Sequence, residues 1–528
     1  MVSSQRVHQR NNMVRHKVLM LAAENGRFAG AKVGGVGDVI RDLPPVLSEA
    51  GCDVMVAMPS YGFLARLPQL EAVATLKVMF GGIVKSVELL RLVDSAHPEQ
   101  VYIFHHPDFA PQGERVYCDD SNDRPFATDA NKFALFCASV ATALLTDVLA
   151  MPSVIHCHDW HTGFLPMLTR RCADYARLAP IKIVYTIHNL AMQGVRPLTS
   201  DPSSLHAWFP NLSGELSDIY DPDYRNCVNP MRAAIRLADV VHTVSPTYAS
   251  EILQPSDTEQ GVFGGERLQA DLQEKADSNA LFGILNGCNY PAKSPRKPAK
   301  KTVVATALAA VEKWMGASVQ LSSTHYLADR RLLTWAKKAK GITVTSVGRI
   351  TEQKVRLLFS PAPNGKIALA NMLDSLGEDG VFIMLGSGAA HYEAALTKLA
   401  GQYANFIFLN GYEETLSELL YHYGDLFLMP SSFEPCGISQ LLAMRAGQPC
   451  LVSSVGGLKD TVTHHANGFV FDGANDAERV VNMQRCFDDA LALYHKQPEA
   501  YKKISVQAKS TRFTWAESAQ EYIAKLYG

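Results

Sequence analysis

The sequence has no excess of charge of either sign: its 528 residues contain 50 Lys and Arg against 52 Asp and Glu. A chain without net positive charge has no general attraction for nucleic acid or for an anionic membrane surface. Neither is therefore expected as a partner. Any anionic ligand must be bound by positive groups gathered at one site.

The sequence also lacks CxxC pairs and long apolar runs. Its 10 Cys are scattered, which favours reduced thiols in the cytoplasm over a disulfide framework. The nearest approach to a membrane span, residues 134–151, contains Asp147 and is bounded by Lys132 and Pro152, so it predicts a buried helix. Residues 1–16 are polar and basic without any acid, and we expect them to form a flexible extension.

What remains is the composition of an ordinary globular protein, with 47% hydrophobic and 19% charged residues. This composition excludes a disordered chain, a collagen and a coiled coil. The length is about three times that of a typical domain, so we expect two domains or one large unit with two lobes.

Short β-branched runs alternate with helical patterns along most of the chain. This alternation is typical of a parallel sheet with helices on both faces. It predicts an α/β fold with two doubly wound, Rossmann-like lobes and a cleft between them. The strand candidates are HKVLMLAAE, CDVMVAMPS, QVYIFHHPD, SVIHCHDW, IKIVYTIHN and DVVHTVS in the first half, and GITVTSVGR, GVFIMLGSG, NFIFLNG, DLFLMPSS and QPCLVSS in the second.

The alternation breaks in the middle of the chain, where the segment PAKSPRKPAKK is basic and rich in proline. We place the boundary between the lobes there. The predicted organisation is an N-terminal lobe over 17–288, a divergent linker region over 289–340 and a C-terminal lobe over 341–510. A last helix within 511–528 is a candidate to cross back onto the first lobe.

Ligands of open α/β sheets bind beyond the carboxyl ends of the strands, so the residues that follow each strand are the candidates. The first such segment is KVGGVGD, residues 32–38. Glycines let the backbone approach a phosphate closely, the start of a helix offers N–H donors, and Lys32 adds a positive charge. A glycine-rich turn that serves packing alone is an equal alternative.

A polar cluster follows the next strands, with His156, His158 and Asp159 on one segment and His188 on another. Zinc is one interpretation, but the segments lack the ligand spacing of known zinc motifs and alternate strand residues point to opposite faces. We therefore favour a ring of partners for sugar hydroxyls, with Trp160 available for stacking. For His188 alone, a structural hydrogen bond is the alternative.

Two further segments lie in the second half. GRITEQK places Arg349 and Lys354 in one loop at a strand end, which suits a diphosphate that gains charge as it leaves. A solvated basic loop is the competing interpretation. PSSFEPCGISQ places Glu434 just ahead of a helix start, where a carboxylate and backbone amides together suit a sugar and its phosphate. A capping role for Glu434 is the alternative.

Seven blocks stand in the order and spacing found in bacterial glycogen synthases and plant starch synthases, and the chain resembles that family outside the linker region. The resemblance implies a two-lobed GT-B fold and a retaining glucosyltransferase that requires no metal or other cofactor. It further implies ADP-glucose as donor and the non-reducing 4-hydroxyl of glycogen or another α-1,4-glucan as acceptor. The blocks are KVGGVGDV, HCHDWHTG, YTIHNLAMQG, GILNG, GRITEQK, LGSG and PSSFEPCGISQ…GGLKDTV.

The resemblance also implies roles for individual residues. Glu434 matches the acid that holds the sugar hydroxyls, and Arg349 and Lys354 match the cations that stabilise the leaving diphosphate. His188 and Asp159 match site residues of the first lobe. The matching substrate-binding residues are Lys32, Gly34, Gly35, Asp38, Asn286, Gly386, Tyr412, Cys436, Gly437 and Ile438.

Several positions depart from the family pattern. Valine replaces Thr in the first loop (Val33) and in the TGGL block (Val455), and Ser432 replaces an Arg. Val355 and Arg356 follow Lys354, where a Gly is usual next. These changes leave open a related transferase that uses UDP-glucose or a small acceptor, and a weakly active glucan-binding homologue. The oligomeric state is not indicated.

Overall fold

The computed structural model describes residues 16–212, 216–293, 295–317, 322–338 and 341–528, so the predicted extension lies outside it except for His16. The chain forms two compact units. The first comprises Met1–Thr186, Met192–Val241 and Ala519–Gly528, and the second comprises Ile187–Ala191 and His242–Ser518. Within the described residues, no helix is long and apolar enough to cross a membrane.

The first sheet has nine strands in the order β11-β10-β7-β6-β1-β2-β5-β4-β3. The strands that pair around β1 are parallel, as the sequence predicts. Their bounds are β1 (Lys17–Leu21), β2 (Asp53–Pro59), β5 (Gln100–His105), β6 (Val154–His158), β7 (Lys182–Ile187), β10 (Val240–Thr243) and β11 (Leu281–Gly283).

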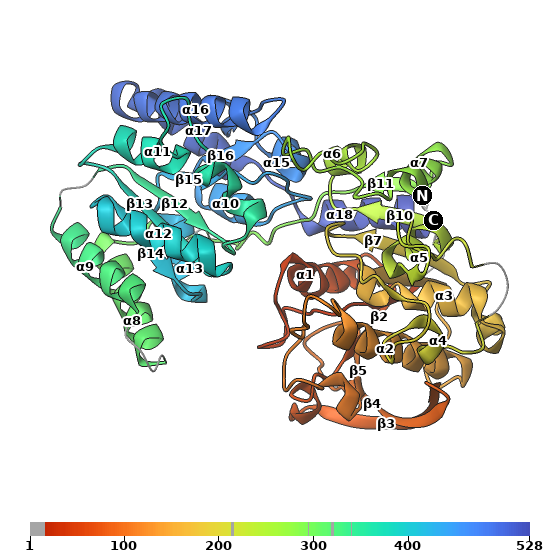
Figure 1. The fold of residues 1–528 in the computed structure, drawn as a ribbon. Helices are drawn as coiled ribbons and strands as arrows, with labels where there is room; N and C mark the ends of the chain where they lie inside the picture. Colours follow the sequence, from red (N-terminus) through yellow and green to blue (C-terminus); the bar gives the residue numbers. More distant parts are fainter. Residues whose placement is uncertain (1–15, 213–215, 294, 318–321, 339–340) are drawn as a thin grey trace, which may run out of the picture. The chain divides into compact units, whose positions relative to one another are not determined.

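An antiparallel hairpin at one edge of this sheet was not expected from the sequence. It consists of β3 (Leu70–Phe80) and β4 (Ile83–Leu92), and β4 also pairs antiparallel with β5 (Figure 1). The burial of β3 alternates along its second half, so one face meets solvent. Gly81 and Gly82, with φ of 63° and 73°, form the two-residue turn that such a hairpin favours.

Helix α2 (Ala127–Leu145) is buried along nearly its whole length, which confirms a buried helix over 134–145 of the predicted 134–151. Residues 146–151 follow the helix as a turn and an irregular segment. The other helices of the first unit are α1 (Gly35–Glu49), α3 (Phe164–Arg171), α4 (Leu205–Trp208) and α5 (Pro230–Leu237). The helix α1 begins directly at the glycine-rich segment, so that segment links β1 to a helix start.

The second sheet has six strands, all parallel, in the order β14-β13-β12-β15-β16-β17 (Figure 1). Along β13, Phe382 and Met384 join one apolar cluster with α11 and α16, while Ile383 and Leu385 join another with α8 and α13. Helices therefore cover both faces, as the doubly wound pattern predicts. The strands are β12 (Thr343–Val347), β13 (Val381–Gly386), β14 (Phe406–Asn410), β15 (Leu426–Met429), β16 (Cys450–Ser453) and β17 (Gly468–Phe471).

Most of the candidate residues of the second half lie in the loops that join these strands to the helices that follow them. These helices are α10 (Glu352–Phe359), α11 (Ala368–Leu376), α12 (Ala390–Gln402), α13 (Glu414–Tyr423), α14 (Ser439–Ala446), α15 (Gly456–Thr461), α16 (Asp476–Lys496) and α17 (Pro498–Ser510). Two earlier helices, α6 (Pro246–Glu251) and α7 (Gln269–Asp277), also belong to the second unit.

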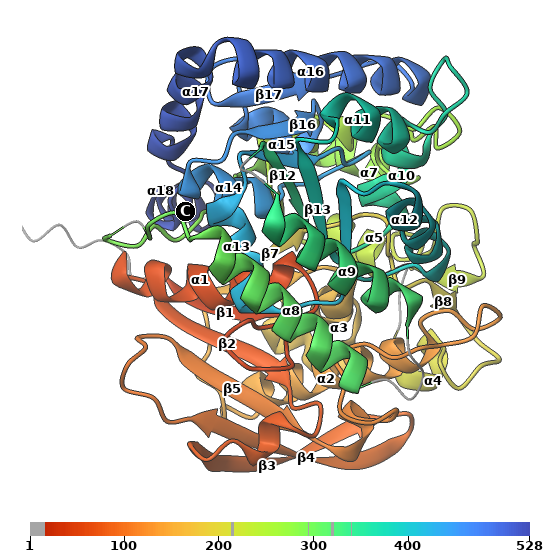
Figure 2. The ribbon, with the colours of Figure 1, turned by 90° about the vertical axis from the view of Figure 1, so that its left-hand side faces the viewer.

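The divergent region contains a helical pair, α8 (Lys300–Gly316) and α9 (Ser323–Lys337). The two helices pack against each other and against α12, α13 and β14 (Figure 2). The side chain of Arg331 donates to the carbonyl oxygen of Ala400 at 3.1 and 3.0 Å, which ties α9 to the end of α12. This part of the chain is thus a packed element of the second unit.

The chain ends with α18 (Trp515–Glu521) and a π-helical turn, Tyr522–Tyr527, and residues 519–528 belong to the first unit. The hydroxyl of Tyr527 lies 2.9 Å from Nδ1 of the buried His156 on β6. The Lys182 ammonium on β7 donates to the carbonyl oxygen of Gly528 at 2.5 Å. The last residues therefore complete the side of the first sheet formed by β6 and β7.

Candidate active site

The glycine-rich segment of the first unit is organised by a buried acid that the sequence analysis did not single out. Oε2 of Glu24 accepts hydrogen bonds from the amides of Val33 at 2.7 Å and Gly34 at 2.6 Å. Its Oε1 accepts from the Tyr117 hydroxyl at 2.7 Å. The only sequence signal for this role is an acid that closely follows β1. The Gly34 amide, expected to face a ligand, here contacts the protein's own carboxylate.

Lys32 and Asp38 of the same segment form an ion pair at 2.7 Å. Asp38 also lies 3.0 Å from Nη1 of Arg41, one turn further along α1. The Lys32 side chain is 38% exposed, so its ammonium can still meet an anionic group in solvent. Gly35 is the first residue of α1 and follows the cap residue Gly34.

Asp159 follows β6 directly and has a positive φ of 55°, which is uncommon for a residue other than glycine. Its side chain is buried. Strained conformations of this kind cluster at functional sites because the surrounding structure must maintain them. The role of Asp159 as a site residue stays a prediction.

The neighbours of Asp159 have structural partners. Nε2 of His156 lies 2.6 Å from the Thr186 hydroxyl, and its other nitrogen contacts Tyr527. Trp160 is 2% exposed and its ring lies against Gly194, so the expected stacking surface is not available and that expectation is wrong. The described residues contain no cluster of His, Cys, Asp or Glu that could hold a metal ion.

His188 follows β7 and is buried. Burial lowers the pKa of His188 to about 3, so the imidazole is neutral at physiological pH. Burial likewise lowers the pKa of His242 to about 3, with His188 contributing. A neutral imidazole has one donor and one acceptor nitrogen, which suits a hydrogen bond to a hydroxyl group better than the binding of an anion.

The carboxylate of Glu434 stands at the carboxyl end of β15 and is 6% exposed. It forms an ion pair with Lys354 of α10 and accepts a hydrogen bond from the Ser431 hydroxyl at 3.0 Å. Gln353 donates to the carbonyl oxygen of Phe433 at 2.9 Å. The fold thus brings together two residues, 80 positions apart, that the sequence analysis assigned to one site.

The loop around Glu434 is packed tightly against the start of α15. Gly457 donates its amide to the carbonyl oxygen of Glu434 at 3.1 Å. A Cβ on Gly456, whose φ is 42°, would lie 1.9 Å from the same oxygen, so only glycine fits there. Gly437 has a φ of 78° and precedes the cap residue Ile438 at the start of α14. Gly456 and Gly457 therefore serve close backbone approach, whereas Gly437 supplies a left-handed backbone conformation.

Cys436 is buried in this loop, and burial raises the pKa of its thiol to about 12, partly opposed by a backbone hydrogen bond from Asn286. A thiol with so high a pKa is not a nucleophile. Asn286 Oδ1 and the Ser432 hydroxyl are both buried and have no hydrogen-bond partner in the described structure. Both atoms can therefore still form hydrogen bonds.

The remaining candidates of the second unit lie at the carboxyl ends of β12, β13 and β14. Arg349 is exposed, and within the described residues no acid forms an ion pair with it. A Cβ on Gly386 would lie 1.9 Å from the Gly348 carbonyl oxygen, so the two loops touch through their backbones. Tyr412 is 62% exposed. Arg349, Gly386 and Tyr412 thus stand at the edge of the second sheet where open α/β sheets generally bind ligands.

Comparisons with known proteins identify the family of the chain. The family model of the starch synthase catalytic domain matches residues 17–274, and the family model of glycosyl transferases group 1 matches residues 334–508. A glycogen synthase of Gloeobacter violaceus is 34% identical over 97% of this chain and 98% of its own length. One of Desulfitobacterium hafniense is 32% identical over 96% and 97%.

Solved structures are similar over the same length. The catalytic domain of starch synthase IV from Arabidopsis thaliana, bound to ADP and acarbose, has a TM-score of 0.73 at 26% identity, over 97% of this chain and 99% of its own. A sucrose-phosphate synthase from Thermosynechococcus elongatus, 15% identical with a TM-score of 0.54, shares the fold. The fold and the site thus define a GT-B glycosyltransferase. Within that class, the chain belongs to the glycogen synthase family.

Proposed function

We propose that this protein transfers glucose, with retention of configuration, from ADP-glucose to the non-reducing 4-hydroxyl of glycogen or another α-1,4-glucan in the cytoplasm. The observation that carries the proposal is the contact between Lys354 and the buried Glu434 at the carboxyl end of the second sheet. The ADP bound to the related starch synthase structure and the names of the curated relatives support the choice of substrates.

In the proposed reaction, the cations of Arg349 and Lys354 neutralise the diphosphate as it leaves. Fixed positive charge acts most strongly where negative charge develops, so it lowers the transition state more than the ground state. Glu434 accepts hydrogen bonds from the glucose hydroxyls. The leaving phosphate helps to deprotonate the attacking hydroxyl on the same face, so no enzyme carboxylate is needed as a nucleophile, and no metal or other cofactor enters the step.

The residues of the first unit complete the proposal. Asp159 is a proposed site residue of that unit. Neutral His188, which follows β7, is proposed to hydrogen-bond the transferred glucose. Exclusion of water from the reacting groups favours transfer over hydrolysis. The proposed substrate-binding residues are Lys32, Gly34, Gly35, Asp38, Asn286, Gly386, Tyr412, Cys436, Gly437 and Ile438.

The predicted division into lobes stays part of the proposal. It comprises an N-terminal lobe over 17–288 on the acceptor side, a linker region over 289–340, and a nucleotide-sugar lobe over 341–510. The segment 511–528 follows as the last helix. The two compact units of the structure are defined by packing alone. The functional division into lobes would be tested by locating the bound substrates.

The test is incorporation of radiolabelled glucose into glycogen by the purified protein, with ADP-glucose and UDP-glucose compared as donors. We expect ADP-glucose to be used with the higher kcat/KM. Glu434→Ala and Glu434→Gln should abolish transfer, since the hydroxyl contacts are lost, while circular dichroism and the melting temperature show a folded protein.

The matched control is Glu418→Gln, because Glu418 is also ion-paired in the second unit, to Arg445 at 3.1 Å, but lies outside the site. That variant should keep its activity. Near-normal turnover by Glu434→Ala would refute the site, and binding of glycogen without incorporation from either donor would refute the proposed reaction.

A further inference from the structure

The Glu434 loop is held by residues that follow β10, far away in the sequence. The hydroxyl of Ser245 donates to the carbonyl oxygen of Pro435 at 2.6 Å, and this contact is buried. The ring of Phe263 lies against the ring of Phe433, with their centroids 4.6 Å apart. Residues on both sides of Glu434 are thus restrained by one segment, residues 245–263, which we call the brace.

The brace also holds α15, whose start touches the backbone of Glu434. Thr247 donates its amide and its hydroxyl to the two carboxylate oxygens of Asp460, at 2.9 and 2.6 Å. Oε1 of Glu251 accepts the amide of Gly456 at 2.9 Å. Because the start of α15 packs on the Glu434 carbonyl, these contacts restrain the loop from a third direction.

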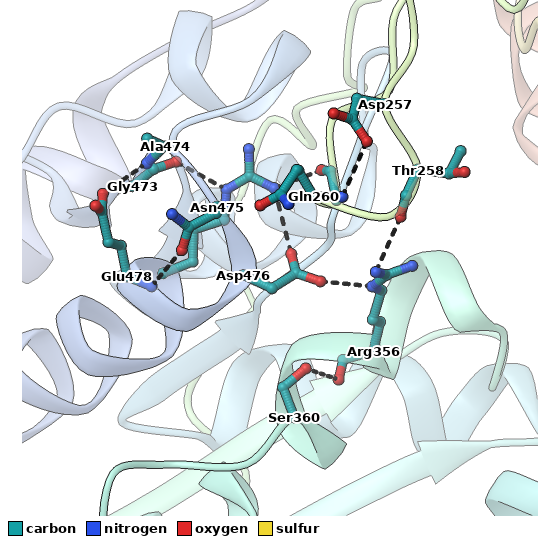
Figure 3. A network of polar contacts seen from close by, with 12 residues as sticks. Asp257, Thr258, Gln260, Arg356, Ser360, Gly473, Ala474, Asn475, Asp476 and Glu478 are labelled. Carbon is teal, nitrogen blue, oxygen red and sulfur yellow. Dashed lines mark hydrogen bonds and ion pairs between the residues drawn. The ribbon is translucent and has the colours of Figure 1, made fainter.

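An ion-pair network anchors the far end of the brace (Figure 3). Nε of Arg356, on α10, donates to Oδ2 of Asp476 at 2.6 Å, while its Nη2 donates to the Thr258 carbonyl oxygen at 3.0 Å. Arg479 lies 3.6 Å from the same carboxylate and donates to the Gly261 carbonyl oxygen at 2.6 Å. Each guanidinium therefore joins the Asp476 carboxylate to one carbonyl group of the brace.

The fit around this network leaves little room. Gly261 has a φ of 72°, and a Cβ at this position would lie 2.1 Å from Oδ1 of Asp476. The side chains of Arg356, Asp476 and Arg479 are 22%, 18% and 13% exposed, so solvent screens their charges only in part. Planar guanidinium groups suit this task because one side chain can serve a carboxylate and a carbonyl group at fixed geometry.

We propose that the brace positions the Glu434 loop and α10 for catalysis, and that Arg356, Asp476 and Arg479 are positioning residues that act through it. Arg356 stands two residues after Lys354 on α10, so its anchor fixes the helix that carries the Lys354 ammonium. Phe263 and Ser245 fix the loop that carries the partner of that ammonium. The catalytic part of this inference rests on the proposed function, whereas the mechanical part does not.

The first test measures how firmly the brace and the Glu434 loop are held, by hydrogen–deuterium exchange of the full-length protein. Arg356→Ala should raise the exchange rate in peptides that cover 255–263 and also in peptides that cover 431–436, by about tenfold or more, because both are held by the brace. The control is Arg445→Ala. Arg445 is comparably buried and also joins a carboxylate, Glu418, to a backbone carbonyl, that of Asn289. This control should leave both peptides unchanged.

The second test is kinetic. Arg356→Ala should lower kcat about 10- to 100-fold while KM for the donor and for glycogen stays within about twofold, since misplacement of reacting groups affects the transition state most. Phe263→Ala should act in the same direction. The double variant should be within about twofold of the slower single variant, because both changes release one brace. Arg356→Lys keeps the charge without the planar fork and should give an intermediate kcat.

Each outcome decides one part of the inference. Unchanged exchange at 431–436 in Arg356→Ala and in Arg356→Lys would overturn the brace. Raised exchange with a normal kcat, or losses of kcat that simply multiply in the double variant, would overturn its role in positioning. A wild-type protein that transfers glucose from no sugar nucleotide would refute the proposed function, while the exchange comparison would still decide whether the brace exists.

Discussion

At the scale of single residues, Arg349 and Lys354 differ in burial and in ion pairing. Lys354 is partly buried in an ion pair with Glu434, so its removal would also leave that carboxylate without a counterion. Arg349 is exposed and has no ion pair within the described residues. A substitution of Arg349 therefore removes positive charge from the candidate site without breaking a structural contact, which makes it the cleaner probe.

Arg349→Ala should lower kcat by about 100- to 1,000-fold, the typical effect of losing one group that stabilises developing charge. KM for ADP-glucose should change much less. The free energy of unfolding, measured in urea, should stay within about 0.5 kcal/mol of the wild type because no packing is lost. Lys366→Ala, an exposed cation paired with Asp374, is the control and should keep full activity. A rise in KM alone would show that Arg349 only binds substrate.

The buried histidines predict how stability depends on pH. In the folded chain, the pKa values of His188 and His242 are about 3, whereas the ordinary value is about 6.5. Between these values the unfolded chain binds more protons, so acid favours unfolding. The stability that the two neutral histidines contribute is fully present above about pH 6.5 and is lost as the pH decreases towards 3. At pH 5 the loss is about 2 kcal/mol per histidine.

Urea unfolding at pH 7.5 and pH 5 tests this expectation. The difference in unfolding free energy between the two pH values should shrink by about 2 kcal/mol in His242→Asn, whatever that variant does to stability at pH 7.5. The wild type and the variant are compared by this difference alone, which removes the packing effect of the substitution. An identical difference in both proteins would show that His242 does not remain neutral on folding.

At the scale of elements, the helical pair α8 and α9 supports the loop after β14. The indole ring of Trp314 lies flat on Gly411, where an added Cβ would come within 2.4 Å of the ring. Nε2 of His325 lies 2.8 Å from the carbonyl oxygen of Asn410. Neither family model covers residues 275–333, so this support is built from a part of the chain outside both.

Gly411→Ala should destabilise the second unit by about 1–3 kcal/mol, because the methyl group forces the indole ring out of its place. The control is Gly316→Ala at the end of α8, where an added Cβ meets no atom within 4 Å. That change should be neutral or should stabilise the protein by about 0.5–1 kcal/mol, since alanine favours the helix. The two variants are compared by thermal and urea unfolding. Equal stability would mean that Trp314 moves aside freely.

The elements also show what the sequence can and cannot predict. The parallel strands were predictable because each is a buried apolar run next to a helical pattern. The hairpin β3–β4 was missed because only its alternation and the Gly81-Gly82 turn mark it. Two strand-end motifs predicted that Lys354 and Glu434 belong to one site, but not that they form an ion pair. Two features could not be predicted: the hydrogen bonds of Glu24 to the glycine-rich segment, and the brace. Contacts such as that between Ser245 and Pro435, 190 positions apart, leave no local pattern in the sequence.

At the scale of the whole molecule, residues 519–528 belong to the same unit as β1. In this first unit, Tyr522, Leu526 and Tyr527 are almost completely buried. Burial raises the pKa of Tyr527 well above its usual value, so its hydroxyl keeps its proton and can donate to His156. The stability of the first unit therefore depends on a segment that is far away in the sequence from the rest of that unit.

Deletion of residues 519–528 should destabilise the first unit selectively. The loss of three large buried side chains, each worth about 2–5 kcal/mol, is comparable with the whole stability of a typical domain, about 5–15 kcal/mol. It also leaves the buried His156 without its Tyr527 partner. Hydrogen exchange should therefore rise throughout α2, while peptides from β13 and α16 in the second unit keep their protection.

Tyr527→Phe removes only the hydroxyl and should cost about 1–3 kcal/mol. Lys525→Ala changes an exposed ion pair on the same turn and should have no effect, since such pairs contribute little. Equal loss of protection in both units after the deletion would show that the two unfold as one, and that the tail stabilises the molecule as a whole.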